Sequence, residues 1–159
     1  MREMLLSFKP EIFDLIRSGR KIYEYRYQFP NESIKAYMYV SKPVQQIVGY
    51  VILGKRIELK EWKTEYKDHP EVVKQIDEYL LRNNKYVMPI LEFHMTKPIS
   101  LTMLNDELKQ FVIPQSYYYM DTFPDLKKYI ESNAEQLQEE IKNSFVKEDF
   151  SNICVRTYD

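Results

Sequence analysis

The charged side chains of Lys21, Glu24 and Arg26 form the group in this chain whose types and spacing best suit chemistry. Charged and apolar or aromatic residues alternate over residues 21–27, which is the two-residue period of a strand, so Glu24 and Arg26 are expected on one face. A carboxylate beside a planar guanidinium can hydrogen-bond the edge of a nucleobase together with a phosphate or another anion. The same two residues can instead form a solvent-exposed salt bridge, and the residue types leave both interpretations open.

Tyrosine is abundant, with 14 residues in the chain. Aromatic rings beside cationic side chains can hold single-stranded nucleic acid or a lone base, and stacking contributes about 1 to 3 kcal/mol per base. In residues 117–119 the strand period turns Tyr118 away from its two neighbours, so the three rings cannot all serve one pocket. We expect most of the tyrosines in the core.

Sequence signatures of common cofactor and metal sites are missing. The chain has three glycines, at positions 19, 49 and 54, so it has no glycine-rich phosphate-binding loop. His69 and His94 are 25 residues apart with no cysteine nearby, so a zinc site would need scattered carboxylates. We therefore predict no metal and no cofactor.

Length and composition predict one domain, residues 1–159, in the cytoplasm. The 159 residues are 44% apolar and 30% charged, as in ordinary globular proteins. No apolar run reaches the roughly 18 to 20 residues of a membrane span, so we expect no membrane partner. Cys154 is the only cysteine, which excludes an internal disulfide, and its thiol is expected to be passive.

Basic charge is concentrated in the N-terminal part of the chain. Residues 1–60 hold 11 Lys or Arg against 6 Asp or Glu, whereas residues 61–159 hold 12 against 18. This asymmetry hints at an anionic partner. The net charge of −1 argues against a protein that binds long nucleic acid by bulk electrostatics.

Periodicity and turn residues predict short strands and helices in irregular order. Pro10 favours a helix start, Ser18 and Gly19 a helix end, and Pro70 interrupts the helical spacing of the middle segment. The predicted strands cover residues 4–8, 21–27, 34–40, 46–53, 86–96 and 117–120. The predicted helices cover residues 10–18, two parts of 61–83, 104–111 and 124–144. Because the strands do not alternate with long helices, an α+β fold with a small β-barrel or curved sheet fits better than a doubly wound parallel sheet.

The last of these helices is predicted from an amphipathic pattern. Its apolar residues step by four and three positions, at Leu126, Ile130, Ala134, Leu137 and Ile141. Their common face can pack on the chain's own barrel, form a homodimer surface or bind another protein.

Four motifs, in order within residues 4–120, resemble the ASCH (activating signal cointegrator homology) domain. They are residues 5–10 (LLSFKP), residues 18–21 (SGRK) with Glu24 and Arg26, residues 36–49 from AYMYVS to IVG, and residues 113–117 (IPQSY). The ASCH domain belongs to the PUA-like superfamily of small β-barrels associated with RNA recognition. The resemblance implies such a barrel over about 4–120, with flanking helices, a helical insertion at about 61–83 and a C-terminal helical addition at about 124–144.

The resemblance also implies a cleft between the first helix and the mouth of the barrel. The predicted ligand-binding residues are Lys9, Lys21, Glu24, Arg26, Tyr39, Ser41, Gln115 and Ser116. The first four would line the cleft, and the last two would lie nearby.

Three functions follow as hypotheses. The first is a module that binds RNA, a nucleotide or a modified nucleoside, with Lys and Arg side chains on an anion and Glu24 on a base amino group. Some ASCH-like proteins are amidohydrolases that remove the acyl group of N4-acetylcytidine with a lysine, a threonine and a glutamate. Lys21 matches that lysine, but Glu24 takes the place of the threonine, so an amidohydrolase with Lys21 and Glu24 as acid and base is the alternative. A protein-interaction domain that uses the C-terminal helix is the third.

Overall fold

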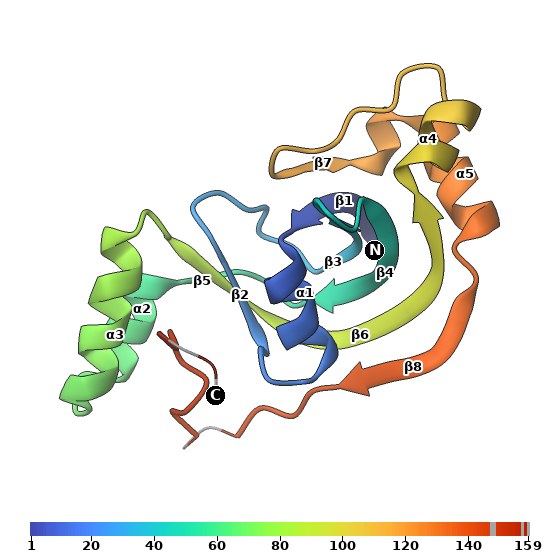
Figure 1. Ribbon diagram of the computed structural model, residues 1–159. Helices are drawn as coiled ribbons and strands as arrows, with labels where there is room; N and C mark the ends of the chain where they lie inside the picture. Colours follow the sequence, from blue (N-terminus) through green and yellow to red (C-terminus); the bar gives the residue numbers. More distant parts are fainter. Residues whose placement is uncertain (147–148, 157, 159) are drawn as a thin grey trace.

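The structure is a computed structural model that describes residues 1–146, 149–156 and 158. Within these residues, eight strands form one curled sheet in the order β2-β6-β4-β3-β1-β7, with β5 and β8 paired to β6 (Figure 1). The strands are β1 (Arg2–Phe8), β2 (Tyr23–Arg26), β3 (Ile34–Val40), β4 (Gln46–Leu53), β5 (Ile57–Glu58), β6 (Tyr86–Ser100), β7 (Tyr117–Tyr119) and β8 (Gln136–Lys142). The helices are α1 (Pro10–Arg17), α2 (Leu59–Glu65), α3 (Pro70–Leu81), α4 (Leu101–Glu107) and α5 (Pro124–Asn133), with a 3-10 helix at Met120–Thr122. The expected α+β fold is confirmed.

Helix α1 begins and ends where the turn residues predict. Pro10 is its first residue, and Ser18 caps its end before Gly19 adopts a φ of +78°. Helix α1 lies on the concave side of the curled sheet (Figure 1). Its residues Phe13 and Ile16 are buried in one apolar cluster with strand residues. The turn at Gly19 then leads the chain directly into β2.

The sheet separates two apolar layers, because successive strand residues point to opposite faces. On β1, Leu6 lies in the layer that contains α1, whereas Leu5 lies in the layer under α5. Leu126 and Ile130 of α5 are buried in this second layer. The apolar face of α5 therefore packs inside its own chain, and a homodimer surface there stays a prediction.

A third apolar cluster lies under the helical insertion. Trp62 of α2 and Ile76 of α3 are buried, and the Trp62 ring meets the Tyr23 ring edge-on at 5.0 Å between centroids. Helix α3 starts at Pro70, so the break predicted within 61–83 is observed. None of the helices that the structure describes has the length and apolar character needed to cross a membrane.

Strand β6 carries most of the pairing in the sheet. Its first part pairs antiparallel with β2 and β5, and its later part pairs with β4 and β8. In this register Glu24 lies opposite Met88 and Arg26 opposite Tyr86. The two charged residues are thus positioned by main-chain pairing on a long strand.

The C-terminal helix predicted over 124–144 is wrong in its second half. Helix α5 ends at Asn133, and residues Gln136–Lys142 form β8 against β6. Strand pairing prevails because the open edge of β6 offers backbone N–H and C=O groups that need partners. Leu137 and Ile141 therefore belong to a strand and do not extend the apolar face of α5.

The helix predicted over 104–111 is also displaced. Helix α4 starts earlier, at Leu101, because the Ser100 side chain caps it by accepting a hydrogen bond from the Met103 N–H at 3.1 Å. It ends at Glu107, and residues 108–111 are not helical.

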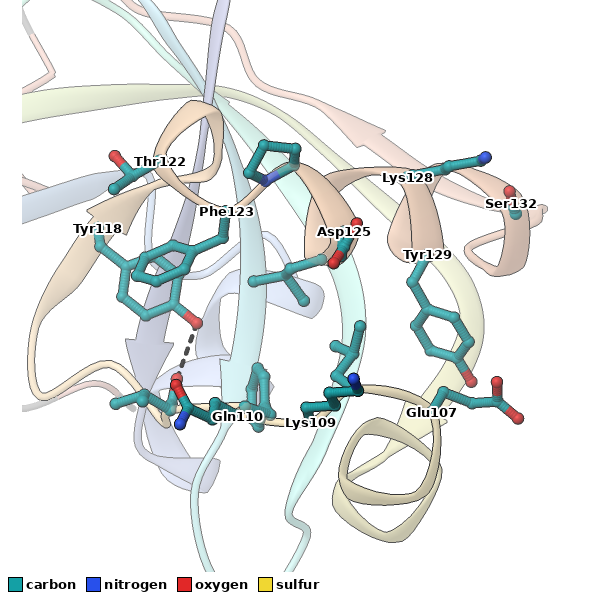
Figure 2. Close-up of a pocket in the computed structure, with 15 residues that line it drawn as sticks. Glu107, Lys109, Gln110, Tyr118, Thr122, Phe123, Asp125, Lys128, Tyr129 and Ser132 are labelled. Atoms are coloured by element: carbon teal, nitrogen blue, oxygen red, sulfur yellow. Dashed lines mark hydrogen bonds between the residues drawn. The ribbon is translucent and has the colours of Figure 1, made fainter.

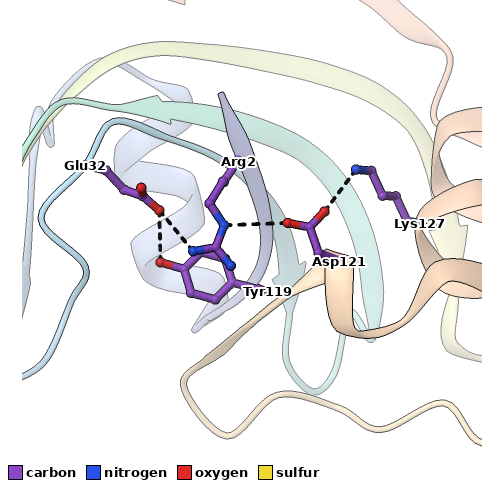
Figure 3. Close-up of polar contacts among 5 residues, drawn as sticks. All are labelled: Arg2, Glu32, Tyr119, Asp121 and Lys127. Atoms are coloured by element: carbon purple, nitrogen blue, oxygen red, sulfur yellow. Dashed lines mark hydrogen bonds and ion pairs between the residues drawn. The ribbon is translucent and has the colours of Figure 1, made fainter.

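A polar network joins the edge of the sheet to the β2–β3 loop and to α5 (Figure 3). Glu32 accepts a hydrogen bond from the Tyr119 hydroxyl at 3.0 Å and lies 3.5 Å from Arg2. The Arg2 guanidinium covers the Tyr119 ring at 3.4 Å and lies 3.5 Å from Asp121, which also pairs with Lys127 at 3.1 Å. Exposed ion pairs each contribute little to stability, so the main consequence is that the β2–β3 loop is held against β7.

Gly49→Ala should lower the free energy of unfolding by about 3 kcal/mol, because its Cβ would lie 2.3 Å from the His94 carbonyl oxygen and push β4 away from β6. Gly19→Ala is the matched control. Its Cβ would meet only the Ile141 side chain, at 3.5 Å, so its positive φ should cost about 1 kcal/mol. Urea denaturation measures both losses. A smaller loss for Gly49→Ala than for Gly19→Ala would contradict the close approach of the two strands.

Candidate functional site

Arg26 joins three parts of the fold at the end of β2. Its guanidinium donates hydrogen bonds to the Ser7 carbonyl oxygen at 3.1 Å and to the Ser116 hydroxyl at 3.2 Å. Its Nε lies 3.5 Å from Glu24 Oε1, so the two side chains pair on the face that the strand alternation predicts them to share. Because a guanidinium carries five N–H donors and 18% of this side chain is exposed, donors remain for another acceptor.

Glu24 is buried beside Arg26 with one oxygen unpaired. Its Oε1 faces Arg26 and accepts a hydrogen bond from the Tyr25 backbone N–H at 3.2 Å. Its Oε2 is buried and has no hydrogen-bond partner among the residues that the structure describes. Since an unpaired buried carboxylate oxygen is costly, a donor group at this position would be strongly favoured.

Lys21 is buried at the entrance to β2. Its Nζ lies 5.0 Å from the centre of the Tyr25 ring and 5.9 Å from that of Tyr158. Burial lowers the pKa of the amine, the carboxylate of Glu24 opposes this effect, and the charge of Arg26 adds to it. An amine in these surroundings gives up its proton more readily than a lysine in water.

The C-terminal segment forms one wall of this site. The Tyr25 hydroxyl accepts a hydrogen bond from the Cys154 backbone N–H at 2.8 Å, and the Tyr79 hydroxyl donates one to the Val155 carbonyl oxygen. Ile153 and Cys154 are buried with Tyr25 in the cluster under α2 and α3. Burial raises the pKa of the Cys154 thiol to about 12, so the thiol stays protonated at neutral pH. This wall was not predicted from the sequence. The only signal for it was the pair of apolar residues at 153–154 in an otherwise polar segment.

Other predicted site residues lie around this group at different depths. Lys9 is exposed at the start of α1, and Ser41 lies near it because the Ser41 N–H donates to the Phe8 carbonyl oxygen at 3.0 Å. Gln115 is exposed in the segment before Ser116, whose hydroxyl is the partner of Arg26 described above. The structure therefore brings Lys21, Glu24, Arg26 and Ser116 together, with Lys9, Ser41 and Gln115 on adjoining surfaces.

Tyr39 faces away from this group. Only 1% of the residue is exposed, and its ring lies in the layer under α5, at 6.3 Å from the Phe111 ring. Strand alternation explains this placement, because Met38 and Val40 on the same strand point to the concave side. The structure does not bring Tyr39 together with Glu24 and Arg26.

His94 links two strands in a way that accounts for its burial. Its Nε2 lies 2.9 Å from Glu92 Oε1, and its Nδ1 lies 3.0 Å from the Gln136 side chain and 3.1 Å from Glu140 Oε2. These partners join β6 to β8. Within the described parts of the chain, no group of three or more His, Cys, Asp or Glu side chains is placed to hold a metal ion.

A hollow of about 770 Å³ lies away from these residues, between α4, α5 and the segment before β7 (Figure 2). Phe111, Phe123 and Tyr129 contribute apolar surface to it, and the Tyr118 hydroxyl donates a hydrogen bond to the Val112 carbonyl oxygen at 2.7 Å. None of the predicted site residues lines this hollow.

Lys21→Met should stabilise the folded protein at pH 7 by about 1 kcal/mol, because it removes a buried ammonium group. The pKa of Lys21 lies lower in the folded chain than its ordinary value of 10.5. Between these two values unfolding takes up a proton, so the contribution of this residue to stability rises with pH, and the variant should lack that rise. Urea denaturation at pH 7 and at higher pH tests both points, with the exposed Lys9→Met as control. The same pH dependence in Lys21→Met and wild type would contradict the burial of the amine.

Comparisons with known proteins identify the family and the fold. The model of the ASCH domain family matches residues 6–148. The ASCH domain-containing ribonuclease of Zymomonas mobilis subsp. mobilis is 26% identical over 136 residues, and the match covers 70% of this chain and 90% of that protein.

Solved structures show the same fold. The crystal structure of ASCH from Zymomonas mobilis matches with a TM-score of 0.60 at 21% identity, covering 84% of this chain and 97% of that one. A variant of that protein with phenylalanine in place of one tyrosine also gives 0.60, at 20% identity, covering 84% and 99%. The fold is thus that of the ASCH crystal structures, and the chain belongs to the ASCH domain family.

Proposed function

We propose that this chain binds RNA, or a nucleotide or modified nucleoside, at the site formed by Lys21, Glu24 and Arg26. Arg26 and Lys21 attract a phosphate or another anion, and Glu24 accepts a hydrogen bond from a base. The RNA association of the family, and a relative described as a ribonuclease, support an RNA-related ligand.

The unpaired Oε2 of Glu24 is the observation that carries this proposal. A carboxylate only accepts hydrogen bonds, and cytosine, adenine and guanine each carry an exocyclic amino group that can donate one. Uracil lacks such a group. The site should therefore prefer bases with an amino group over uracil.

The two cations beside Glu24 suit the phosphate of the same nucleotide. The fork of Arg26 matches the geometry of phosphate oxygens, and its remaining donors are partly exposed. An anion near Lys21 would favour the protonated amine and so offset the burial that lowers its pKa. Ligand binding would then complete contacts that the free protein leaves unmade.

Arg26→Ala should weaken binding of cytidine 5′-monophosphate about tenfold or more, because hydrogen bonds to a charged group contribute about 1.5 to 3 kcal/mol each. Isothermal titration calorimetry at several salt concentrations measures the loss, and the salt dependence should become shallower in the variant. Arg17→Ala is the control, since Arg17 is an exposed arginine that pairs with Glu139 of β8. Equal affinity of Arg26→Ala and wild type, with both proteins folded by circular dichroism, would contradict the proposal.

RNA cleavage at the same site is a second candidate. It is favoured by the ribonuclease relative together with the lowered pKa of the Lys21 amine, which brings this group closer to the range useful for proton transfer. Incubation with end-labelled single-stranded RNA should yield shortened products with the wild type and none with Lys21→Ala. N4-acetylcytidine belongs in a parallel incubation as the substrate of the alternative amidohydrolase. No shortened RNA above the Lys21→Ala background would exclude cleavage and leave binding alone.

A further inference from the structure

A smaller hollow of about 290 Å³ lies at the end of β2, beside the proposed site. Its lining includes two cations, Arg56 and Lys85, and the aromatic residues Tyr27, Tyr86 and Tyr117. No acidic residue is among the described residues that line it. The hollow is therefore basic and aromatic in character.

The aromatic residues of the hollow differ in how far they are buried. The Tyr86 ring is largely buried and lies under the Arg56 guanidinium at 4.0 Å and near the Lys85 amine at 5.3 Å. Tyr117 packs against Phe29 at 5.5 Å between ring centroids. Tyr27, by contrast, is 53% exposed, so one aromatic ring is available to a ligand.

The hollow adjoins the site around Arg26 along the chain. Tyr27 follows Arg26 in the chain, and the Lys85 N–H donates a hydrogen bond to the Arg26 carbonyl oxygen at 3.1 Å. Tyr117 follows Ser116, which accepts a hydrogen bond from Arg26. Residues that follow Arg26 and Ser116 in the chain therefore line the hollow, so we expect a ligand longer than one nucleotide to reach it.

The walls of the hollow are held in place on two sides. The Arg56 guanidinium donates a hydrogen bond to the Phe29 carbonyl oxygen in the β2–β3 loop. The same loop is fixed to β7 by Glu32 and Tyr119 (Figure 3). A preformed hollow loses less conformational entropy on binding than a mobile one.

We propose that this hollow binds a second nucleotide of a single-stranded RNA whose first nucleotide occupies the site at Glu24 and Arg26. This inference rests on the proposed function. The base stacks on the Tyr27 ring, and the phosphate between the two nucleotides lies near Lys85 and Arg56. Single-stranded RNA fits better than an acidic peptide, because the exposed ring can stack on a base while the neighbouring cations bind a phosphate.

Fluorescence anisotropy with labelled hexacytidylate, compared with calorimetry on cytidine 5′-monophosphate, tests the inference. Tyr27→Ala should weaken binding of the hexamer about tenfold and leave the mononucleotide unchanged, whereas Tyr27→Phe should keep the affinity because it keeps the ring. Lys85→Ala should weaken the hexamer and reduce its salt slope by about one. Lys109→Ala, which removes an exposed lysine far from β2 in the sequence, is the charge control and should bind as the wild type.

The outcomes separate this inference from the function on which it rests. If Arg26→Ala loses both ligands but Tyr27→Ala and Lys85→Ala bind the hexamer as the wild type does, the second subsite is overturned and the first stands. Equal weakening of mononucleotide and hexamer by Tyr27→Ala would also overturn it. A third result would overturn it too: polyglutamate displaces the hexamer equally well from the wild type and from Tyr27→Ala. The hollow would then recognise an acidic polymer. Failure of the wild type to bind either ribonucleotide would overturn both proposals.

Discussion

The pairing of β6 on both edges is the constraint on which the rest of this structure depends. Its first part fixes β2 and so places Glu24 and Arg26, and its later part carries β4 and β8. One continuous strand therefore connects the charged site, the helical insertion and the curled sheet. Because side chains alternate along a strand, a shift of β2 by one residue would turn both charged groups to the other face.

The site places charge where burial makes it costly. Lys21 and Glu24 are 6% and 7% exposed, and Arg26 satisfies only one oxygen of the carboxylate. Groups of this kind destabilise a protein that has no ligand, and they are common where binding or catalysis requires them. The affinity of the site would then come mainly from contacts that the free protein leaves incomplete.

Local signals in the sequence predicted those parts of the fold that depend on neighbours in the chain. Helix α1 was predictable from Pro10 and Gly19, and the common face of Glu24 and Arg26 from strand alternation. The second half of the predicted C-terminal helix was wrong because the strand at residues 136–142 depends on an open edge 40 to 50 residues earlier in the chain. The wall formed by residues 153–155 could not be predicted either, because it depends on hydrogen bonds to Tyr25 and Tyr79 from distant elements.

The position of Trp62 gives this molecule an optical reporter of its own. It is the only tryptophan in the chain, it is 4% exposed, and its ring meets Tyr23 edge-on. The same cluster contains Cys154 of the wall beside Lys21 and Tyr25, to which this wall is hydrogen-bonded. Since indole emission moves to longer wavelengths when water reaches the ring, the fluorescence of the unlabelled protein follows the packing behind this wall. Movements there can therefore be observed in solution in real time, without a dye that would disturb a buried site.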